Sequence, residues 1–190
     1  DDTVFTRSFS MLIISLLLFR NVTRKFLCKE IFDEVKNKII LYCYKENDLR
    51  GYDNEKGWIH SAAHTADALC NLILNNECDR STVLEVLESI KQVLNNKKYI
   101  FANEEDERIA RVIFELVENQ KVSNEMLMSW FNELVSVQEQ VQGREKYHSR
   151  VNIKNFIRSL YFSFLYINGN DIITSKLIEV ENRLNRYICH

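Results

Sequence analysis

The feature that most constrains the fold of this chain is the complete absence of proline from its 190 residues. Proline fixes φ and removes a backbone donor, so a chain without it lacks the strongest signal that ends a helix. The chain also has only four glycines, which are too few for the tight turns of a many-stranded sheet. Both observations predict an all-α protein, and the length suits a single helical domain over residues 1–190.

Apolar residues recur at helical spacing in eight segments of the chain. These segments are Thr3–Arg20, Thr23–Lys45, Trp58–Asn75, Asp79–Asn95, Asn103–Asn119, Ser123–Gln142, Asn152–Asn168 and Asp171–Cys189. Most links between them are short, which predicts antiparallel neighbours. Helix pairs would start near Trp58, Asn103 and Asn152, a spacing close to the roughly 40–47-residue period of HEAT-type repeats. We therefore expect stacked antiparallel hairpins, as a HEAT-like α-solenoid or a compact bundle of about eight helices.

Polar residues predict several helix boundaries. Asn103 and Ser123 are suited to cap helix starts, because a short polar side chain there can accept a backbone N–H. Gly169 and Asn170 predict a stop after Asn168. A polar loop is expected over residues 46–57.

Composition excludes several classes of partner and compartment. The formal charge of −2 provides no general attraction to nucleic acid or anionic membranes, so neither is expected as a partner. The five cysteines are odd in number and form no Cys-x-x-Cys pair, which argues against a zinc ribbon or a disulfide framework. They are Cys28, Cys43, Cys70, Cys78 and Cys189. Reduced thiols predict a cytoplasmic protein.

The segment Met11–Phe19 is intensely apolar. It is shorter than the roughly 20 residues of a membrane-spanning helix, and it lacks the basic start and cleavage site of a signal peptide. We therefore expect it to form a buried core helix. The chain begins at Asp1 without a methionine, which suggests a fragment of a slightly longer chain.

The most distinctive chemistry lies on the segment Trp58–Leu74. One stripe at helical spacing is apolar and predicts the core face: Ile59, Ala62, Ala66, Leu69 and Ile73. A polar stripe runs one residue later, roughly 100° around the helix: His60, His64, Asp67 and Asn71. These polar groups would lie at the edge of the buried face, where a groove could form.

The polar stripe permits three interpretations. In the first, His60 and His64 converge on a divalent metal with Asp67 one turn away, as in a metal-dependent hydrolase. That interpretation is weakened by Ser61, which stands where a zincin motif needs glutamate. In another interpretation, the polar groups of the stripe are hydrogen-bonded within the protein and fix the helix register without any ligand.

The remaining interpretation of the polar stripe is a binding site for a small anionic ligand. The preceding loop brings Arg50, Lys56 and Trp58 beside a predicted helix N-terminus, where free N–H groups favour anions. Arg108 can reach the site from a neighbouring helix, and Arg158 is a weaker candidate.

The sequence Asp48–Tyr52 (DLRGY), followed by Lys56–Asp67 (KGWIHSAAHTAD), resembles a motif of the bacterial domain-of-unknown-function family DUF2785. Ile59 and Thr65 depart from its usual alanine and glycine, and both departures keep the polar stripe. Three further segments are similar to that family: Phe5–Ser10, Glu105–Arg111 and Asn155–Phe162. The resemblance implies a bacterial, cytoplasmic helical protein and brings no established activity.

Together these observations favour a non-catalytic helical-repeat module without a cofactor. It would bind a small anionic ligand or a protein partner at the loop and helix 48–71. The alternative is the metal-dependent hydrolase with His60, His64 and Asp67 as ligands.

Overall fold

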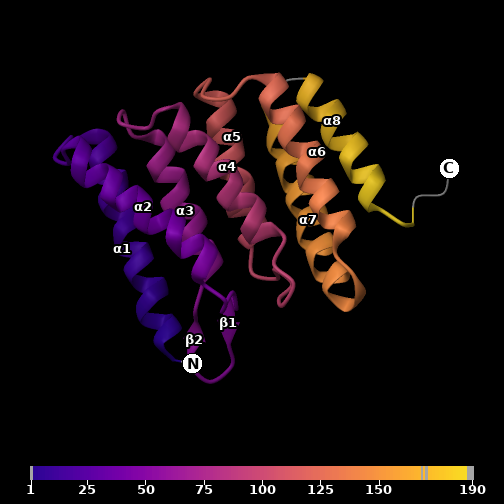
Figure 1. The fold of residues 1–190 in the computed structure, drawn as a ribbon, viewed down its shortest axis with the longest axis horizontal. Helices are drawn as coiled ribbons and strands as arrows, with labels where there is room; N and C mark the ends of the chain where they lie inside the picture. The colour runs from indigo at the N-terminus through magenta and orange to yellow at the C-terminus, as the bar shows by residue number, and fades with distance from the viewer. Residues whose placement is uncertain (1, 168, 170, 188–190) are drawn as a thin grey trace.

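The computed structural model describes residues 2–167, 169 and 171–187, and within these residues it confirms an all-α fold with eight helices (Figure 1). The helices are α1 (Thr3–Thr23), α2 (Lys29–Lys45), α3 (Ser61–Leu74), α4 (Arg80–Leu94), α5 (Glu105–Glu118), α6 (Asn124–Gln140), α7 (Gly143–Tyr166) and α8 (Asp171–Leu184). Two short strands, β1 (Tyr52–Asp53) and β2 (Gly57–Trp58), form a hairpin between α2 and α3.

The helices pack mainly with their next-but-one neighbours. α1, α3, α5 and α7 lie side by side in that order, while α2 packs beside α4 and α6 beside α8 (Figure 1). α7 and α8 also pack closely together as a consecutive pair. For most of the chain, the principal contacts therefore join successive predicted hairpins rather than the two helices of one hairpin. This order places α3 between α1 and α5, and so positions the polar stripe between two neighbours.

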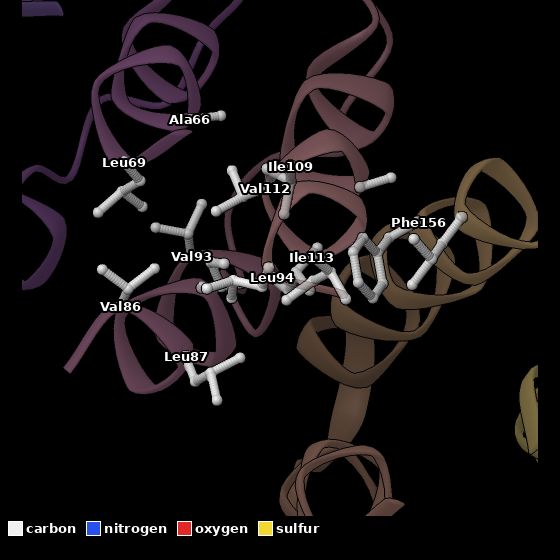
Figure 2. Packing of buried hydrophobic residues seen from close by; sticks show 14 of the residues in the cluster. Ala66, Leu69, Val86, Leu87, Val93, Leu94, Ile109, Val112, Ile113 and Phe156 are labelled. Atoms are coloured by element: carbon white, nitrogen blue, oxygen red, sulfur yellow. The ribbon is translucent and has the colours of Figure 1, made fainter. Parts of the chain in front are cut away.

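The core lies between the two rows of helices. Leu69 of α3, Val93 of α4, Val112 of α5 and Phe156 of α7 converge there (Figure 2) and are almost completely buried. The predicted core stripe of α3 is confirmed, since each of its residues is buried. The small residues of α3 let α1 and α5 approach its backbone closely: Ala62, Ala63, Ala66 and Ala68.

α1 is the first helix of its row and buries only one face. Met11 and Leu18 are buried, whereas Ile13, Leu17 and Phe19 are 56%, 51% and 56% exposed. The expectation that Met11–Phe19 forms a buried core helix is therefore wrong for the outer face, because α3 is the main packing partner of α1. Among the described residues, α1 is also the one helix long and apolar enough to cross a membrane.

Several helix boundaries differ from expectation. α2 begins at Lys29 rather than Thr23, because the Asn21 carboxamide accepts hydrogen bonds from the backbone N–H groups of Phe26 and Leu27 and holds the link open. α7 begins at Gly143, nine residues before the expected start at Asn152. Gly143 has a φ of 64°, a conformation that glycine adopts without a steric penalty.

One predicted cap is confirmed and another is wrong. The Ser123 hydroxyl accepts from the backbone N–H of Met126. Asn103 does not cap α5, because the N-cap position of this helix is occupied by Glu104. The predicted stop at Asn168 and Asn170, and the helix end at Cys189, lie outside the described residues.

Candidate functional site

The expected polar loop before α3 contains the β1–β2 hairpin, which the sequence did not indicate. Tyr52 pairs with Trp58 and Asp53 with Gly57. At the base of the hairpin, the Gly51 carbonyl accepts hydrogen bonds from the backbone N–H groups of Ile59 and His60, at 2.9 and 3.0 Å. The hairpin projects beyond the helices near the N-terminus (Figure 1).

His60 does not belong to α3, as the sequence suggested, but immediately precedes it in a left-handed conformation, with φ 52° and ψ 31°. This conformation costs a non-glycine residue about 1–2 kcal/mol. The imidazole stacks on Trp58 with the ring centroids 4.3 Å apart and the planes 8° from parallel. His60 Nδ1 is buried and has no hydrogen-bond partner within the described chain. The residue is thus strained in its backbone and unsatisfied in its side chain.

The start of α5 repeats this pattern beside the start of α3. Glu104 is left-handed, with a φ of 65°, and Glu105 follows it with only 1% of its surface exposed. Glu105 Oε2 accepts from the Asn103 backbone N–H at 2.8 Å, whereas Oε1 has no partner among the described residues. A buried carboxylate oxygen without a donor is costly and needs an explanation.

Gly51 connects these two helix starts. A Cβ placed on Gly51 would lie 2.2 Å from Glu105 Oε1 and 2.3 Å from Asn103 Nδ2. The Glu105 carboxylate therefore lies against the same glycine whose carbonyl holds His60. Sequence reasoning missed Glu105. The only signal was the acidic run 104–107, which does not show which carboxylate turns inward.

His64 is buried and bonded to α1. Its Nδ1 lies 2.9 Å from the Ser8 hydroxyl, which itself donates to the Ile59 carbonyl. Because the Ser8 hydrogen is already donated, His64 Nδ1 carries the proton in this contact. Burial lowers the pKa of His64, which favours the neutral ring. His64 thus holds α3 against α1.

Asp67 and Arg108 join α3 to α5. Arg108 Nη1 donates to Asp67 Oδ2 at 2.6 Å, and both side chains are partly exposed. A partly exposed ion pair of this kind stabilises a fold by about 1 kcal/mol or less. The sequence placed both residues in the site, and the structure pairs them with each other.

The two loop cations are also paired within the chain. Arg50 donates to Asp48 through two nitrogens at 2.7 and 2.8 Å, and to Asp53 at 2.8 Å. These carboxylates raise the pKa of Arg50. Lys56 donates to Asp2 at 2.5 Å. Both cations stabilise the loop by contacts that an anionic ligand would have to replace.

The structure brings together only some of the predicted site residues. Trp58, His60 and His64 form a continuous row of rings, with 5.6 Å between the two imidazole centroids. Arg158 lies on α7 and donates to Glu181 at 2.6 Å. Within the described chain, no group of three His, Cys, Asp or Glu side chains is arranged to hold a metal ion.

The larger cavities that we find have other linings. One of 670 Å³ is lined by residues that include Tyr44, Gln92 and Val137, and one of 370 Å³ lies beside Arg7, Lys45, Lys98 and Asp48. Another of 600 Å³ lies between α5 and α7, beside Arg111 and Phe162. The Trp58–His60 surface is instead a projection with buried polar atoms at its base.

A protein-family model described as "Protein of unknown function (DUF2785)" matches residues 1–162. No curated protein and no solved structure matches the chain.

Proposed function

The chain belongs to the DUF2785 family of proteins of unknown function, and we propose that it is a non-catalytic module that binds a protein partner. The binding surface, which we name the hairpin site, comprises Gly51, Tyr52, Trp58, His60 and Glu105. The observation that carries the proposal is that two of the three buried side-chain atoms without partners in the described chain, His60 Nδ1 and Glu105 Oε1, belong to residues that contact Gly51.

Backbone strain supports a role at this position. His60 and Glu104 are two of the three non-glycine residues with positive φ in the described chain, and each directly precedes a helix that borders the hairpin site. Strained residues and unsatisfied polar groups tend to collect at binding sites, because stability alone would remove them. The local structure therefore retains a cost that a bound partner can offset.

The shape of the site favours a protein partner over a small molecule. Tyr52 and Trp58 contact each other edge to face, at 4.9 Å, and are 47% and 51% exposed. Exposed aromatic residues on a projection commonly dominate the energy of protein interfaces. A small ligand is usually enclosed in a cleft, and the cavities described above have other linings.

The charges around the hairpin site favour a basic segment of the partner. Arg50, Lys56 and Arg108 are each paired with a carboxylate, whereas Glu55 and Glu104 are exposed. A lysine or arginine from the partner would find the exposed carboxylates of Glu55 and Glu104 here. Because the three cations are already paired with carboxylates, the site is less suited to binding a small anionic ligand.

The metal-dependent hydrolase receives less support from the geometry. Asp67 accepts from Arg108, and in the described part of the chain His60, His64 and Asp67 do not form a group arranged to hold a metal ion. Protein purified without an affinity tag, and analysed for bound metal, provides the direct test. Stoichiometric metal that is lost in His64→Ala would revive this alternative.

The proposal also covers the type of helical fold and the cellular location of the module. We infer a HEAT-like repeat stack, because helices pack with their next-but-one neighbours, and a bacterial, cytoplasmic protein. The four cysteines in the described chain are free thiols, which fits a reducing compartment.

Photo-crosslinking in the organism that produces the protein tests the hairpin site. A photoreactive phenylalanine analogue replaces Tyr52 in the full chain. We expect one discrete covalent adduct with a partner, and we expect Trp58→Ala to remove it, because the aromatic pair supplies the main contact area.

A second tyrosine provides the matched control. Tyr147 is 51% exposed, close to the 47% of Tyr52, and lies on α7 rather than on the hairpin. The same probe at position 147 should give no adduct of that mass. Equal adducts from both positions, or none from position 52, would refute the proposal.

A further inference from the structure

We propose that the surface where α2, α4 and α6 end binds an extended acidic peptide of a partner protein. This surface, which we name the α2–α4 groove, is formed by two cavities of 370 and 670 Å³. Both cavities are lined by Glu46, Asn47 and Lys98, so they adjoin one another. The inference is independent of the hairpin site, because no residue of that site lines either cavity.

The walls of the α2–α4 groove are the ends of packed helices. α2 packs directly beside α4, and the links that follow these two helices contribute Leu49 and Lys98 to the lining. Side chains near the helix ends are held by the packing of the helices, so the groove is formed before any ligand binds. The last turns of α2, α4 and α6 supply Tyr44, Lys45, Gln92, Val93, Val137 and Gln140.

The α2–α4 groove is positively charged, whereas the chain as a whole is not. The lining of the two cavities contains four cations and two anions, which gives it a formal charge of +2. The whole chain has a formal charge of −2. This local excess of positive charge favours an anionic ligand. The cations are Arg7, Lys45, Lys97 and Lys98, and the anions are Glu46 and Asp48.

The two anions of the groove are already paired within the fold. The Glu46 side chain is only 3% exposed, and it accepts from two nitrogens of Arg7 at 2.7 and 3.0 Å. Asp48 accepts from two nitrogens of Arg50 at 2.7 and 2.8 Å. Neither carboxylate is therefore left to repel an acidic ligand at full strength.

Two lysines of the groove are not paired in this way. Lys45 and Lys98 are exposed, and neither ammonium group forms an ion pair with a residue that the structure describes. Lys98 Nζ lies over the ring of Tyr99, 6.0 Å from its centroid. Both ammonium groups can therefore bind carboxylates of a ligand.

The rest of the lining suits a peptide better than a small anion. Gln92 and Gln140 are exposed, and their carboxamides make no hydrogen bond within the described residues. A carboxamide both donates and accepts, so it can bond to the N–H and C=O groups of an extended peptide backbone. Tyr44 and Val137 line the same cavity and are 46% and 39% exposed. They offer contact area to an apolar side chain, which a simple phosphate or carboxylate lacks.

A nucleic-acid strand is a less suitable occupant than an acidic peptide. A polynucleotide carries charge along its whole length, so it would extend beyond the groove over the remaining surface. Since the groove has a formal charge of +2 and the chain one of −2, the remaining residues are net acidic. A short peptide meets only the positive groove.

Selection of random peptides on the full chain tests the proposal. Phage that display random peptides of about twelve residues are selected on the wild-type protein, and the enriched peptides are synthesised with a fluorescent label. We expect them to share a pattern of acidic residues next to an apolar residue. Fluorescence polarisation then gives the dissociation constant of each labelled peptide.

Two groove variants should weaken peptide binding. Lys45→Gln/Lys98→Gln should raise the dissociation constant about tenfold, because two exposed charge pairs are lost. Val137→Glu should raise it by at least as much, because it places a carboxylate against an acidic ligand. The controls are Lys38→Gln on α2, an exposed lysine without an ion pair in the described chain, and Leu84→Glu on α4, at a site 49% exposed. Neither position lines the groove, so both controls should bind as the wild type does.

Several outcomes would overturn the proposal. The selection could enrich no family of peptides, or only peptides without acidic residues. Enriched peptides could bind both groove variants as tightly as the wild type. Peptides that lose affinity in Trp58→Ala and keep it in the groove variants would belong to the hairpin site instead. An oligothymidylate of similar length that binds more tightly than every enriched peptide would assign the groove to nucleic acid.

Discussion

The two ends of α3 treat their buried polar groups in opposite ways. At the C-terminal end, Asn71 donates to the Ser15 hydroxyl of α1 at 2.9 Å, and Asn75 donates to the Leu18 carbonyl at 3.2 Å. Asn75 Oδ1 also accepts from Asn21 Nδ2 at 2.6 Å. These contacts form a satisfied polar ladder that fixes how α1 lies on α3.

At the N-terminal end, two buried polar atoms have no partner in the described chain, His60 Nδ1 and Glu105 Oε1, and the backbone is left-handed at His60. α3 therefore has a satisfied polar ladder at its C-terminal end, whereas its N-terminal end is bordered by two residues with unsatisfied polar atoms. Such a contrast is expected where stability and binding compete. Substitutions that remove a partner should accordingly lower stability at the satisfied end, whereas a substitution that relieves the left-handed backbone at His60 should raise stability and weaken binding.

The largest expected effect is at the satisfied end. Asn75→Ala removes the partner of the Asn21 carboxamide and of the Leu18 carbonyl, both inside the structure. We expect the free energy of unfolding in urea to fall by about 2–3 kcal/mol, because buried polar groups are left unpaired.

Asn119→Ala is the matched control for this change. Asn119 bonds to the carbonyl of Glu115 one turn earlier, as Asn75 bonds to that of Asn71, but it is exposed. Its loss should cost about 0.5 kcal/mol or less. Equal losses in the two variants would mean that the ladder does not hold α1 in place.

A smaller loss is expected from Gly51→Ala at the strained end. The new methyl group would overlap Glu105 Oε1 and Asn103 Nδ2, and the displaced side chains should cost about 1–3 kcal/mol. Glu105→Ala would remove one of the overlapping groups, so the same glycine change should cost less in that background. A double-mutant cycle without coupling would show that Gly51 and Glu105 are not in contact.

Sequence patterns predicted the parts of α3 that periodicity controls. The apolar stripe is buried, and His64, Asp67 and Asn71 lie on its border as expected. Alternation of apolar and polar residues reports which face of a helix is buried. It does not report which neighbour each border residue meets, so it left open whether His64 and Asp67 bind ligands or, as observed, bond to Ser8 and Arg108.

The misjudged parts depend on contacts between distant segments. His60 continues the stripe in sequence but lies outside the helix, because the Gly51 carbonyl captures its backbone N–H. Glu105 looks like one acid among four until the packing of α5 against Gly51 turns it inward. The apolar composition of α1 predicted that the whole helix is buried. Its sequence does not show that α3 covers mainly one of its faces.

A modest gain in stability is expected from His60→Gly. Glycine adopts the left-handed conformation without the steric penalty, so we expect the free energy of unfolding to rise by about 1 kcal/mol. Photo-crosslinking through position 52 should nevertheless be lost, because the imidazole that stacks on Trp58 is removed.

Gln120→Gly separates strain from binding in this comparison. Gln120 is also left-handed, with a φ of 54°, but it is exposed at the end of α5. Its replacement should bring a similar gain in stability and leave crosslinking intact. If His60→Gly instead destabilises the fold, the conformation at His60 is held by its stacking on Trp58 and carries no stored strain.

The smallest expected effect concerns pH, and it distinguishes the two ends of α3 by chemistry. Burial lowers the pKa of His64 below its ordinary value of 6.5, so the unfolded chain binds a proton more readily than the folded chain. The free energy of unfolding should therefore fall as pH decreases below about 6.5 and level off once the folded-state pKa is passed.

Glutamine in place of His64 cannot titrate, so His64→Gln should reduce the slope between pH 7.5 and 5.5, with a difference of about 1 kcal/mol or less over that range. Asn75→Ala removes no titrating group and should lower the whole curve evenly. Carboxylates such as Asp48, whose pKa is lowered chiefly by its hydrogen bond from Arg50, add a separate loss below about pH 4. An unchanged slope in His64→Gln would show that the folded protein binds a proton at His64 as readily as the unfolded chain does.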